Sequence, residues 1–336
     1  MNILSSATSA PQLGIYVPAY KSTFLRESLA SICAQTDQRF NLYVGDDASP
    51  QALKEVVSEF TARRPVSYHR FDVNLGGRSL AKQWSRCLAL GNEPWVWLFA
   101  DDDVMDPQCV SRFYEVLAET GGSFDVYRFN HRVIQANGQE AYPTTLHPKV
   151  ETGLQFACAR LQGVRYGFAQ ELVLSRRKLV QIDGFVEFPL AWAADDATLI
   201  LMAGDKGIRT IPGPKVHWRL SGQNLSSMVT GGYAHQKAQA SALFVAWLLE
   251  NLPKLDAKGY RDVQEVIFRE SRDWYRNQIE SLPVVWSPAD MWRMSKFGNE
   301  MWGEGRHRWL GWLLRVGIRR LRRRARNSLS CAYVNP

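Results

Sequence analysis

Three consecutive carboxylates, Asp101, Asp102 and Asp103, are the residues whose chemistry is easiest to infer from the sequence. Adjacent carboxylates repel one another unless a cation neutralises them. Their hard oxygen atoms suit Mg2+ or Mn2+, which bind one or two carboxylates together with substrate phosphates. The tripeptide therefore indicates a divalent-metal site, and a solvated acidic loop with a helix cap before Pro107 is the structural alternative.

Two acidic pairs offer further chemistry. Asp46-Asp47 follows an apolar run, where an Asx-turn is the structural alternative. Asp195-Asp196 opens a helical pattern, where it could cap the helix. Two acids are more than one cap requires, so the pair is also a candidate functional site. Partial burial beside aromatic residues would raise the pKa of such a carboxylate and suit it to act as a base.

The elements that must position these acids alternate between strand and helix. Strands are expected at 13–17, 41–45, 66–71 and 95–99, and helices at 24–35, 51–63 and 78–90. This alternation predicts βαβ units and a parallel sheet, whose ligands bind beyond the carboxyl ends of the strands. Pro18-Ala19-Tyr20, Asp46-Asp47 and the three carboxylates all stand at such ends, so we expect them at one rim.

The rest of the chain is less regular and then helical. Strands are expected at 125–134 and 171–175, and helices at 176–182, 197–206, 233–252, 258–282 and 309–326. We therefore predict an α/β fold followed by a helical region.

Five sequence blocks occur in a characteristic order. The first, Leu13–Pro50, reads LGIYVPAYKSTFLRESLASICAQTDQRFNLYVGDDASP. Asn74-Leu75-Gly76-Gly77 with the acidic cluster, LVLSRRKLVQIDGF over 172–185, Asp195-Asp196, and Val216 to Ser226 follow. Together these blocks resemble the family-2 glycosyltransferases over about two thirds of the chain. The resemblance implies a GT-A fold, that is, a Rossmann-like mixed sheet flanked by helices, over residues 1–227, with a helical extension over residues 228–336. It also implies inverting transfer of a sugar from a nucleotide donor, with about 13–110 binding the donor and 111–227 forming the acceptor side.

The resemblance also implies roles for residues of the first block. Pro18 and Tyr20 would line the pocket for the base and the ribose, and Asp47 would accept a hydrogen bond from the base, with Asp46 beside it. The donor would be a UDP, GDP or dTDP sugar.

The helix expected at 78–90 offers two cations. Arg78 and Lys82 could meet phosphate oxygens, and a solvated helix face is the alternative. The chain departs from the family here, because the family usually has Asn near Gln83.

The acidic cluster departs from the family's common Asp-Ala-Asp-Asp pattern. Ala100 stands where the first acid is usual, and Asp102 and Asp103 match the final pair. The resemblance implies that this pair binds Mg2+ or Mn2+, with Asp102 the preferred ligand, and that Asp101 contacts ribose or metal. Such a metal would hold the diphosphate and offset the charge that grows on the leaving group.

The later blocks imply an acceptor site. The second acid of the Asp195-Asp196 motif is the family's general base, so Asp196 would take the proton from an acceptor hydroxyl while Asp195 orients the acceptor. His217, Arg219 and Ser221 could approach the diphosphate or the metal, and a structural role at a strand end is the alternative for His217.

The net charge of the chain is +8, from 41 basic and 33 acidic residues. Residues 290–336 hold eleven of the basic residues and three of the acids, so the rest of the chain is neutral. A basic tail on a neutral body argues against a nucleic-acid partner.

The sequence also bears on the cellular compartment. Five cysteines without a CxxC pair fit a reducing compartment. We expect neither a signal peptide nor a membrane span, and therefore predict a cytoplasmic location.

The tail has amphipathic order over residues 309–326. Apolar positions gather on one side of the expected helix: Leu310, Leu313, Leu314, Ile318, Leu321 and Ala325. Arginines gather on the other, and tryptophans suit a headgroup interface. We predict a helix on an anionic membrane surface, at the cytoplasmic face of the inner membrane, serving a lipid-linked or oligosaccharide acceptor. Packing against the catalytic part and an RNA-binding arm are the alternatives.

Two other functions are alternatives to glycosyl transfer: an enzyme of another class and a non-catalytic scaffold. A nucleotidyltransferase also places acids at strand ends, but it would normally want a glycine-rich basic loop after the first strand, where Pro18-Ala19-Tyr20-Lys21 stands. A non-catalytic scaffold that keeps the fold is the other, and the presence of Asp102 and Asp196 counts against it.

Overall fold

The computed structural model describes residues 12–230 and 232–332, with side chains up to residue 322. The chain divides into two compact units. The sheet unit comprises the described residues up to 157, with 165–187 and 194–224, and the helical unit comprises 158–164, 188–193 and the described residues from 225 onwards. Residues 1–11 lie outside the described part, and they form most of the stretch 1–12 in which we expected no signal peptide. Residues 333–336 also lie outside it.

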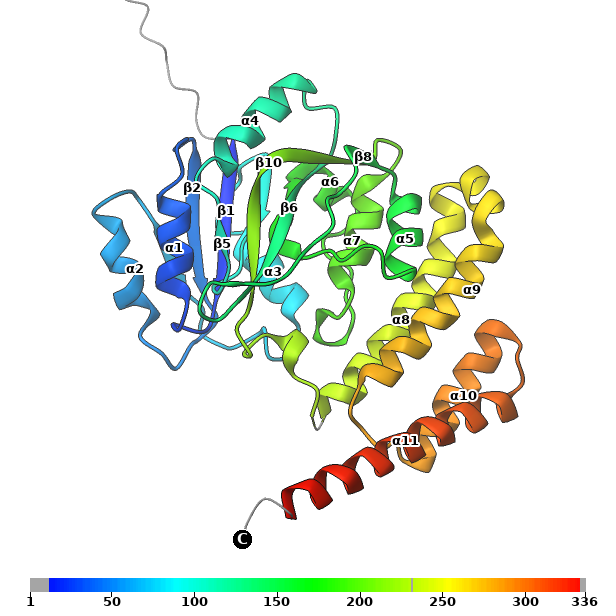
Figure 1. Cartoon of the computed structure of the whole chain (residues 1–336). Helices are drawn as coiled ribbons and strands as arrows, with labels where there is room; N and C mark the ends of the chain where they lie inside the picture. The colour runs from blue at the N-terminus through cyan, green and yellow to red at the C-terminus, as the bar shows by residue number, and fades with distance from the viewer. Residues whose placement is uncertain (1–11, 231, 333–336) are drawn as a thin grey trace, which may run out of the picture. The chain divides into compact units, whose positions relative to one another are not determined.

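The sheet unit is built on one ten-stranded sheet (Figure 1). Its strands are β1 (Leu13–Ala19), β2 (Phe40–Asp46), β3 (Ser67–Arg70), β4 (Trp95–Leu98), β5 (Val104–Met105), β6 (Val126–Gln135), β7 (Glu140–Tyr142), β8 (Val150–Glu151), β9 (Leu172–Ser175) and β10 (Ile208–Leu220). The order is β3-β2-β1-β4-β9-β6-β10-β5, with β7 on β6 and β8 on β10. β1 to β4 run parallel, whereas β9 is antiparallel to both its neighbours, so the predicted mixed sheet is confirmed.

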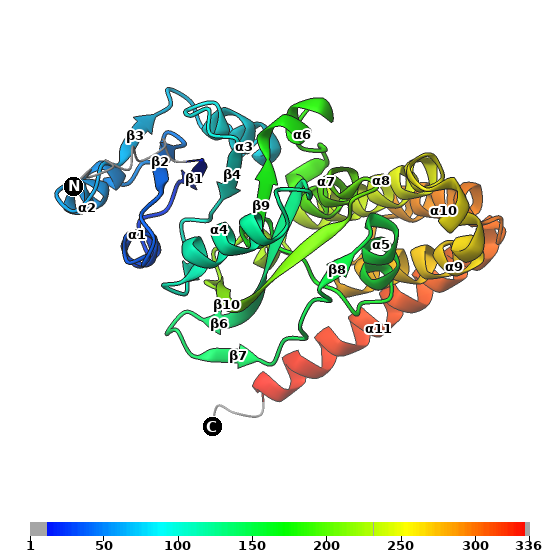
Figure 2. The same ribbon diagram turned by 90° about the horizontal axis from the view of Figure 1, so that it is seen from above.

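Helices cover both faces of this sheet (Figure 2). They are α1 (Leu25–Cys33), α2 (Leu53–Thr61), α3 (Leu80–Leu88), α4 (Cys109–Glu119), α5 (Gly153–Leu161), α6 (Arg176–Gln181) and α7 (Ala194–Ala203), with a short 3-10 turn η1 (Ala169–Glu171) before β9. α1 and α4 lie on one face, with α2 beside α1, and α3, α6 and α7 lie on the other. The alternation in β1 explains the packing, because Ile15, Val17 and Ala19 share the core with the apolar residues of α1, α2 and α4.

The opposite face of β1 carries a polar network. Tyr16 donates a hydrogen bond from its hydroxyl to Glu93, and Tyr43 and Asn41 both donate to Glu93 Oε1 at 2.7 Å. Arg176 donates to the Tyr16 hydroxyl at 2.7 Å and to the backbone carbonyl of Glu93 at 2.7 Å. The first arginine of the Arg-Arg block therefore holds α6 to the amino ends of the parallel strands.

Strand register brings the expected rim together. Ala19 lies opposite Asp46 in the β1–β2 ladder, and the backbone N–H of Asp47 donates to the carbonyl of Ala19 at 2.9 Å. The N–H of Phe99, just beyond β4, donates to the carbonyl of Tyr16 at 2.8 Å. The carboxyl ends of β1, β2 and β4 therefore meet at one edge, as the sequence predicted.

The sequence pattern did not predict α4, α5, β5, β7, β8 or β10. β10 is a thirteen-residue strand, although Pro212-Gly213-Pro214 marks a break. The strand continues because its ladder with β6 shifts register between Ile211 and Lys215, which accommodates the prolines as a bulge. The helix α10 (Pro288–Trp302) was also not predicted, even though Ser287 and Asp290 form its capping box.

The helical unit consists mainly of α8 (Gly232–Leu255), α9 (Ala257–Ser281), α10 and α11 (Arg306–Ala332). Aromatic side chains join the last three helices: Trp302 stacks on Trp309 with ring centroids 5.3 Å apart, and Tyr275 contacts both. Arg276 lies over the Trp309 ring at 4.5 Å. The predicted helical extension is confirmed. None of the described helices combines the length and hydropathy that a membrane span needs.

Close packing of α10 on α11 gives a stability prediction. A Cβ atom at Gly298 would stand 2.3 Å from the Trp309 ring, so Gly298→Ala should destabilise the chain by about 1–3 kcal/mol through overpacking. A Cβ atom at Gly317 of α11 would have no other atom within 4 Å. Gly317→Ala should therefore be neutral or stabilise the chain by up to about 1 kcal/mol. Urea denaturation of the two full-length variants checks this, and equal midpoints would contradict the packing.

Candidate active site

Asp101 begins the acidic cluster directly after β4 and is almost fully buried. Its Oδ2 accepts hydrogen bonds from the backbone N–H groups of Tyr20 and Lys21, each at 2.9 Å. Burial raises the pKa of Asp101, while the ammonium of Lys21, 4.0 Å from its Oδ1, acts in the opposite direction. Asp101 therefore fastens the turn after β1 to the end of β4.

Asp102 and Asp103 differ in how their oxygens are used. Asp102 Oδ2 accepts from Ser221 Oγ at 2.8 Å and from Asn224 Nδ2 at 3.2 Å, and lies 3.6 Å from Lys21 Nζ. Asp103 Oδ1 accepts from the backbone N–H of Arg219 at 2.8 Å, but its Oδ2 is buried without a hydrogen-bond partner. Burial, and then the neighbouring Asp102, raise the pKa of Asp103 well above its usual range.

Arg219 supports this cluster from β10. Its guanidinium donates to the carbonyl of Asp102 at 2.8 Å, to the carbonyl of Ala136 at 2.9 Å and to Glu27 at 2.6 Å. It also lies over the Phe24 ring at 4.5 Å. Its donors are therefore engaged by the protein, and in this conformation Arg219 positions the acidic loop rather than presenting its charge to a ligand.

His217 lies two residues earlier on β10 and contacts a different acid. Its Nε2 is 2.9 Å from Asp106 Oδ1, and the same carboxylate accepts from the backbone N–H of Lys215. The structure therefore brings Ser221, not His217, to Asp102. Within the described residues, the expected ligand set of Asp102, Asp103 and His217 does not converge on one point.

Asp46 and Asp47 each bind protein groups with both oxygens. Asp46 has no exposed surface and accepts from the Ser49 N–H at 2.7 Å, the Tyr68 hydroxyl at 2.5 Å and Arg70 at 2.7 Å. It thereby joins β2 to β3 and to the following turn. In this conformation protein groups occupy both oxygens of Asp46, and the residue has no exposed surface.

Asp47 organises the Asn-Leu-Gly-Gly loop. Its oxygens accept from the backbone N–H groups of Leu75 and Gly76 at 2.7 and 2.8 Å, from Asn74 Nδ2 at 2.9 Å, and from Arg86. A Cβ atom at Gly76 would stand 2.7 Å from Asp47 Oδ2, which explains why this position is glycine. A hydrogen bond from a base to Asp47 would share these oxygens with the loop.

The other expected donor-site residues flank this rim. Pro18 lies in β1 opposite Gly45, and the Tyr20 side chain is 42% exposed next to the acidic cluster. Arg78 is exposed in the loop before α3, and Lys82 on α3 lies 3.6 Å from Glu187. The rim thus combines an exposed aromatic ring and exposed cations with buried acids.

Asp195 and Asp196 lie in the first turn of α7, as predicted. The backbone N–H of Asp196 donates to Asp195 Oδ1 at 3.0 Å, and Asp196 is nearly fully buried. Three non-glycine residues with left-handed backbone directly precede the pair: Leu190, Ala191 and Ala193. Left-handed backbone is strained for such residues and concentrates at functional sites, which fits a positioned acid here.

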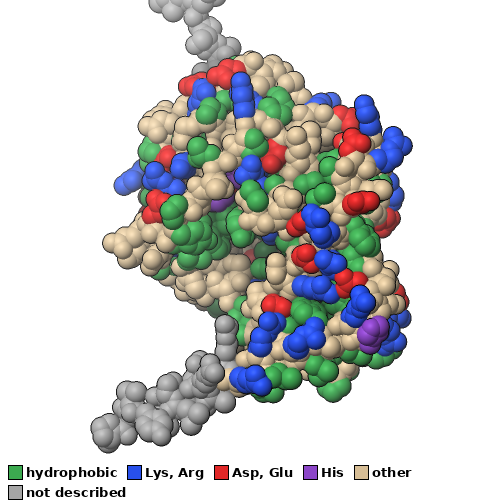
Figure 3. Space-filling model, turned by 45° about the vertical axis from the view of Figure 1, so that its right-hand side comes forward, with side chains coloured by type: hydrophobic (Ala, Val, Ile, Leu, Met, Phe, Trp, Pro, Cys, Tyr) green, Lys and Arg blue, Asp and Glu red, His purple; other side chains and the backbone are tan. Residues whose placement is uncertain are grey.

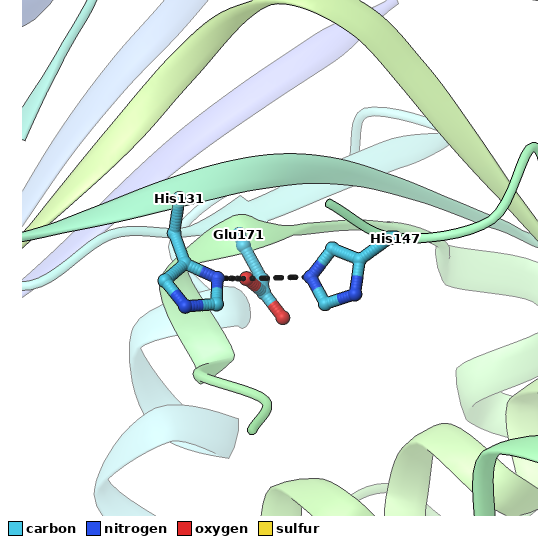
Figure 4. A group of neighbouring side chains, drawn as sticks. All are labelled: His131, His147 and Glu171. Carbon is cyan, nitrogen blue, oxygen red and sulfur yellow. Dashed lines mark hydrogen bonds and ion pairs between the residues drawn. The ribbon is translucent and has the colours of Figure 1, made fainter. Parts of the chain in front are cut away.

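A second polar cluster, which the sequence reasoning missed, lies on the expected acceptor side (Figure 4). His131 Nδ1 is 2.7 Å and His147 Nε2 3.5 Å from Glu171 Oε2, and all three side chains are buried. Burial opposes ionisation of Glu171, but the two imidazoles outweigh it and lower its pKa to about 2. Burial lowers the pKa of His147. No regular spacing marks residues 131, 147 and 171, so only their tertiary contacts could reveal this cluster.

Gly167 connects this cluster with Asp196. A Cβ atom at Gly167 would lie 3.4 Å from Asp196 Oδ1, 3.5 Å from the Phe156 ring and 3.7 Å from Glu171 Oε1. Next to it, Phe168 stacks on Trp218 at 4.6 Å and meets the edge of His131 at 4.9 Å. The sheet unit therefore places the expected base, a buried histidine–glutamate cluster and a pair of stacked aromatic rings in one neighbourhood.

Known structures share this architecture at low sequence identity. TarS 1–349 of S. aureus in complex with UDP-GlcNAc aligns with a TM-score of 0.58 and 15% identity, covering 91% of this chain and 90% of that one. The same protein with UDP gives 0.54 and 16%, with the same coverage. The mannosyltransferase PcManGT from Pyrobaculum calidifontis in complex with GDP-Man and Mn2+ gives 0.51 and 15%, covering 94% and 88%. The fold is thereby that of the GT-A proteins.

Residues 14–169 match the family model described as glycosyl transferase family 2. The match covers just under half of the chain, and together with the shared fold it indicates a glycosyltransferase of the GT-A kind. No curated protein matches the sequence. The family match favours a glycosyltransferase over the nucleotidyltransferase alternative.

Proposed function

We propose that this glycosyltransferase moves a sugar from a nucleoside diphosphate sugar to an acceptor hydroxyl with inversion at the anomeric carbon, assisted by a divalent cation. The observation that carries the proposal is the buried cluster Asp101–Asp103 at the carboxyl edge of the sheet, inside the family match. The structural relatives complexed with UDP, UDP-GlcNAc and GDP-Man support a nucleotide-sugar donor.

The residues of the cluster fit a divalent cation. Asp103 Oδ2 is a buried oxygen without a hydrogen-bond partner, and Asp102 beside it supplies a second hard oxygen ligand. Mg2+ and Mn2+ prefer this donor chemistry, and the Mn2+ in the PcManGT complex supports the assignment. When bound, the metal would hold the diphosphate and offset the charge on the leaving group. His217 is not included, because its imidazole is held by Asp106.

The rim around the cluster supplies the remaining donor contacts. The exposed ring of Tyr20, with Pro18, would pack on the base and ribose, and Asp101 would hold this turn in place. Asp47 would present the ordered loop at Leu75–Gly76 to the base. Arg78 would approach the phosphates from that loop.

A metal-dependence experiment tests the donor site. UDP and GDP sugars should raise the thermal midpoint of the wild-type chain only with Mn2+ or Mg2+ present, because the diphosphate needs the cation. Asp103→Asn should abolish this shift. Asp205→Asn, an exposed acid of the sheet unit, is the matched control and should retain it. A donor shift of equal size without metal would sink the assignment.

Asp196 is proposed as the general base. Its place in the first turn of α7 lets Asp195 fix its backbone, and the stacked pair Phe168 and Trp218 nearby would carry an acceptor sugar. Asp196 would take the proton from the acceptor hydroxyl as that oxygen attacks the anomeric carbon from the face opposite the diphosphate. Attack from that face would invert the configuration at the anomeric carbon.

Replacing this base gives a kinetic prediction. Asp196→Asn should lower kcat by about 10²–10⁴-fold, because the amide cannot accept the proton. The metal-dependent thermal shift with the donor should survive, since Asp196 does not belong to the acidic cluster. Transfer assays with a panel of glycan and lipid-linked acceptors measure kcat, and undiminished turnover in the variant would remove Asp196 from this role.

The acceptor is proposed to be lipid-linked or an oligosaccharide, met at an anionic membrane surface on the cytoplasmic face. α11 supports this with two separate apolar stripes. Trp309, Leu313 and Val316 are buried, whereas Leu314, Ile318 and Leu321 are 54%, 48% and 54% exposed.

The exposed stripe of α11 is bordered by charge. Arg315 and Arg322 are exposed along its edge, and Figure 3 shows Lys and Arg side chains beside hydrophobic ones on the helical unit. A surface cavity of about 360 Å³ next to it is lined by Arg308, Arg315 and His307, among others. Each arginine near an anionic leaflet adds about 1 kcal/mol of attraction. The side chains of residues 323–326, which we also expected on this surface, lie outside the described part.

Flotation with vesicles tests the membrane proposal. The wild-type chain should float with phosphatidylglycerol-containing vesicles, and the combined change of Leu314, Ile318 and Leu321 to Gln should abolish flotation without unfolding, because these side chains are exposed. Leu243→Gln, 43% exposed on α8, is the matched control. Point changes are preferable to truncating α11, since Trp309 is part of the core. Equal flotation of all three proteins would contradict the proposal.

A further inference from the structure

The cluster of His131, His147 and Glu171 has the composition of a transition-metal site. The three residues come from β6, from the segment between β7 and β8, and from η1. One ligand atom of each, a ring nitrogen of His131, a ring nitrogen of His147 and a carboxylate oxygen of Glu171, lies within 4.8 Å of the others. Figure 4 shows both imidazole rings turned toward the same carboxylate. We propose that this cluster binds one Zn2+ ion, at a site distinct from the acidic cluster of the donor site.

The spacing of the ligand atoms fits zinc coordination. In a tetrahedral site with bonds of about 2.0–2.1 Å, ligand atoms lie about 3.3 Å apart. The observed separations from Glu171 Oε2 are 2.7 Å to His131 and 3.5 Å to His147, which bracket that value. Two imidazole nitrogens and one carboxylate oxygen are a known zinc donor set, whereas Mg2+ and Ca2+ prefer oxygen ligands alone.

Charge favours a cation at this point. Glu171 is completely buried, and a buried carboxylate needs a compensating positive charge. The nearby buried arginine, Arg128, pairs with Glu151 at 2.9 Å, so the direct side-chain partners of Glu171 are the two imidazoles. A protonated imidazole is the other way to supply the charge, and metal analysis separates the two.

Surrounding contacts already hold the ligands in place. Glu171 Oε1 accepts from the Phe168 N–H at 3.3 Å, and Asn130 Oδ1 accepts from the His147 N–H at 2.8 Å. Thr144 Oγ1 donates to the His131 carbonyl at 2.7 Å. Such outer contacts orient metal ligands in proteins. A zinc ion here would tie the Phe168 segment, which stacks on Trp218, to β6, and so order the surroundings of Asp196.

Metal content tests the inference on the full-length chain, purified without a histidine tag and dialysed after exposure to Zn2+. The wild type should retain about one zinc per chain by plasma mass spectrometry. Glu171→Gln and His147→Gln should each lose it. His69→Ala, which removes an exposed histidine of β3, should retain it, and so should Asp103→Asn, because the donor-site cation is separate. Zinc should also raise the thermal midpoint of the wild type and of neither cluster variant.

X-ray absorption at the zinc edge keeps the proposal falsifiable if the cluster variants fail to fold. The wild-type spectrum should show nitrogen and oxygen ligands at about 2.0–2.1 Å with imidazole scattering and no sulfur, which excludes binding by cysteines. A wild-type chain that retains no zinc overturns the proposal. Equal retention by folded Glu171→Gln and wild type, or a spectrum with sulfur ligands, overturns it as well.

Discussion

Electrostatic repulsion among three buried carboxylates is the constraint around which the sheet unit is arranged. Asp101, Asp102 and Asp103 stand together at the end of β4 with almost no exposed surface, and burial raises the pKa of Asp101 and Asp103. The protein meets this cost with donors from distant segments: backbone N–H groups after β1, the Lys21 ammonium, and Ser221 and Asn224 after β10. One oxygen of Asp103 has no hydrogen-bond partner, and the proposed cation site depends on this oxygen.

The same constraint explains the length of β10. The strand must pass beside β6 and still deliver its last residues to the acidic loop, where the Arg219 backbone and guanidinium bind Asp103 and Asp102. A bulge at Pro212-Gly213-Pro214 lets it do so without ending. Carboxylates elsewhere in the unit act similarly: Asp46 and Asp47 organise turns with both oxygens. A site residue in this fold therefore also organises the loops around it, which is why substitutions there must be controlled for folding.

The sequence predicted those helices and strands whose apolar residues recur with a regular period within the element itself. β1 to β4, α1 to α3 and the helices α8, α9 and α11 have apolar periodicity within one element, and the acids at the strand ends followed from the parallel arrangement. The resemblance to the family, on ordered blocks, led to the correct fold. The cluster of His131, His147 and Glu171 was missed because three separate segments build it. His217 was predicted as a metal ligand because it lies in the last block of the resemblance, whereas the pairing of β10 with β5 places His217 next to Asp106.

The tail shows why a helical wheel alone could not choose between packing and membrane binding. A helical wheel places the apolar residues of both stripes on one side of the helix. In the structure, however, Leu313 is buried and Leu314, the next residue, is exposed. The arginines divide in the same way: Arg319 pairs with Glu280, and Arg320 donates to the backbone carbonyl of Ile279. Packing therefore uses one apolar stripe and these two arginines. The exposed stripe and Arg315 and Arg322 are not needed to hold α11 in its unit, and an apolar stripe bordered by arginines matches an anionic lipid surface better than water.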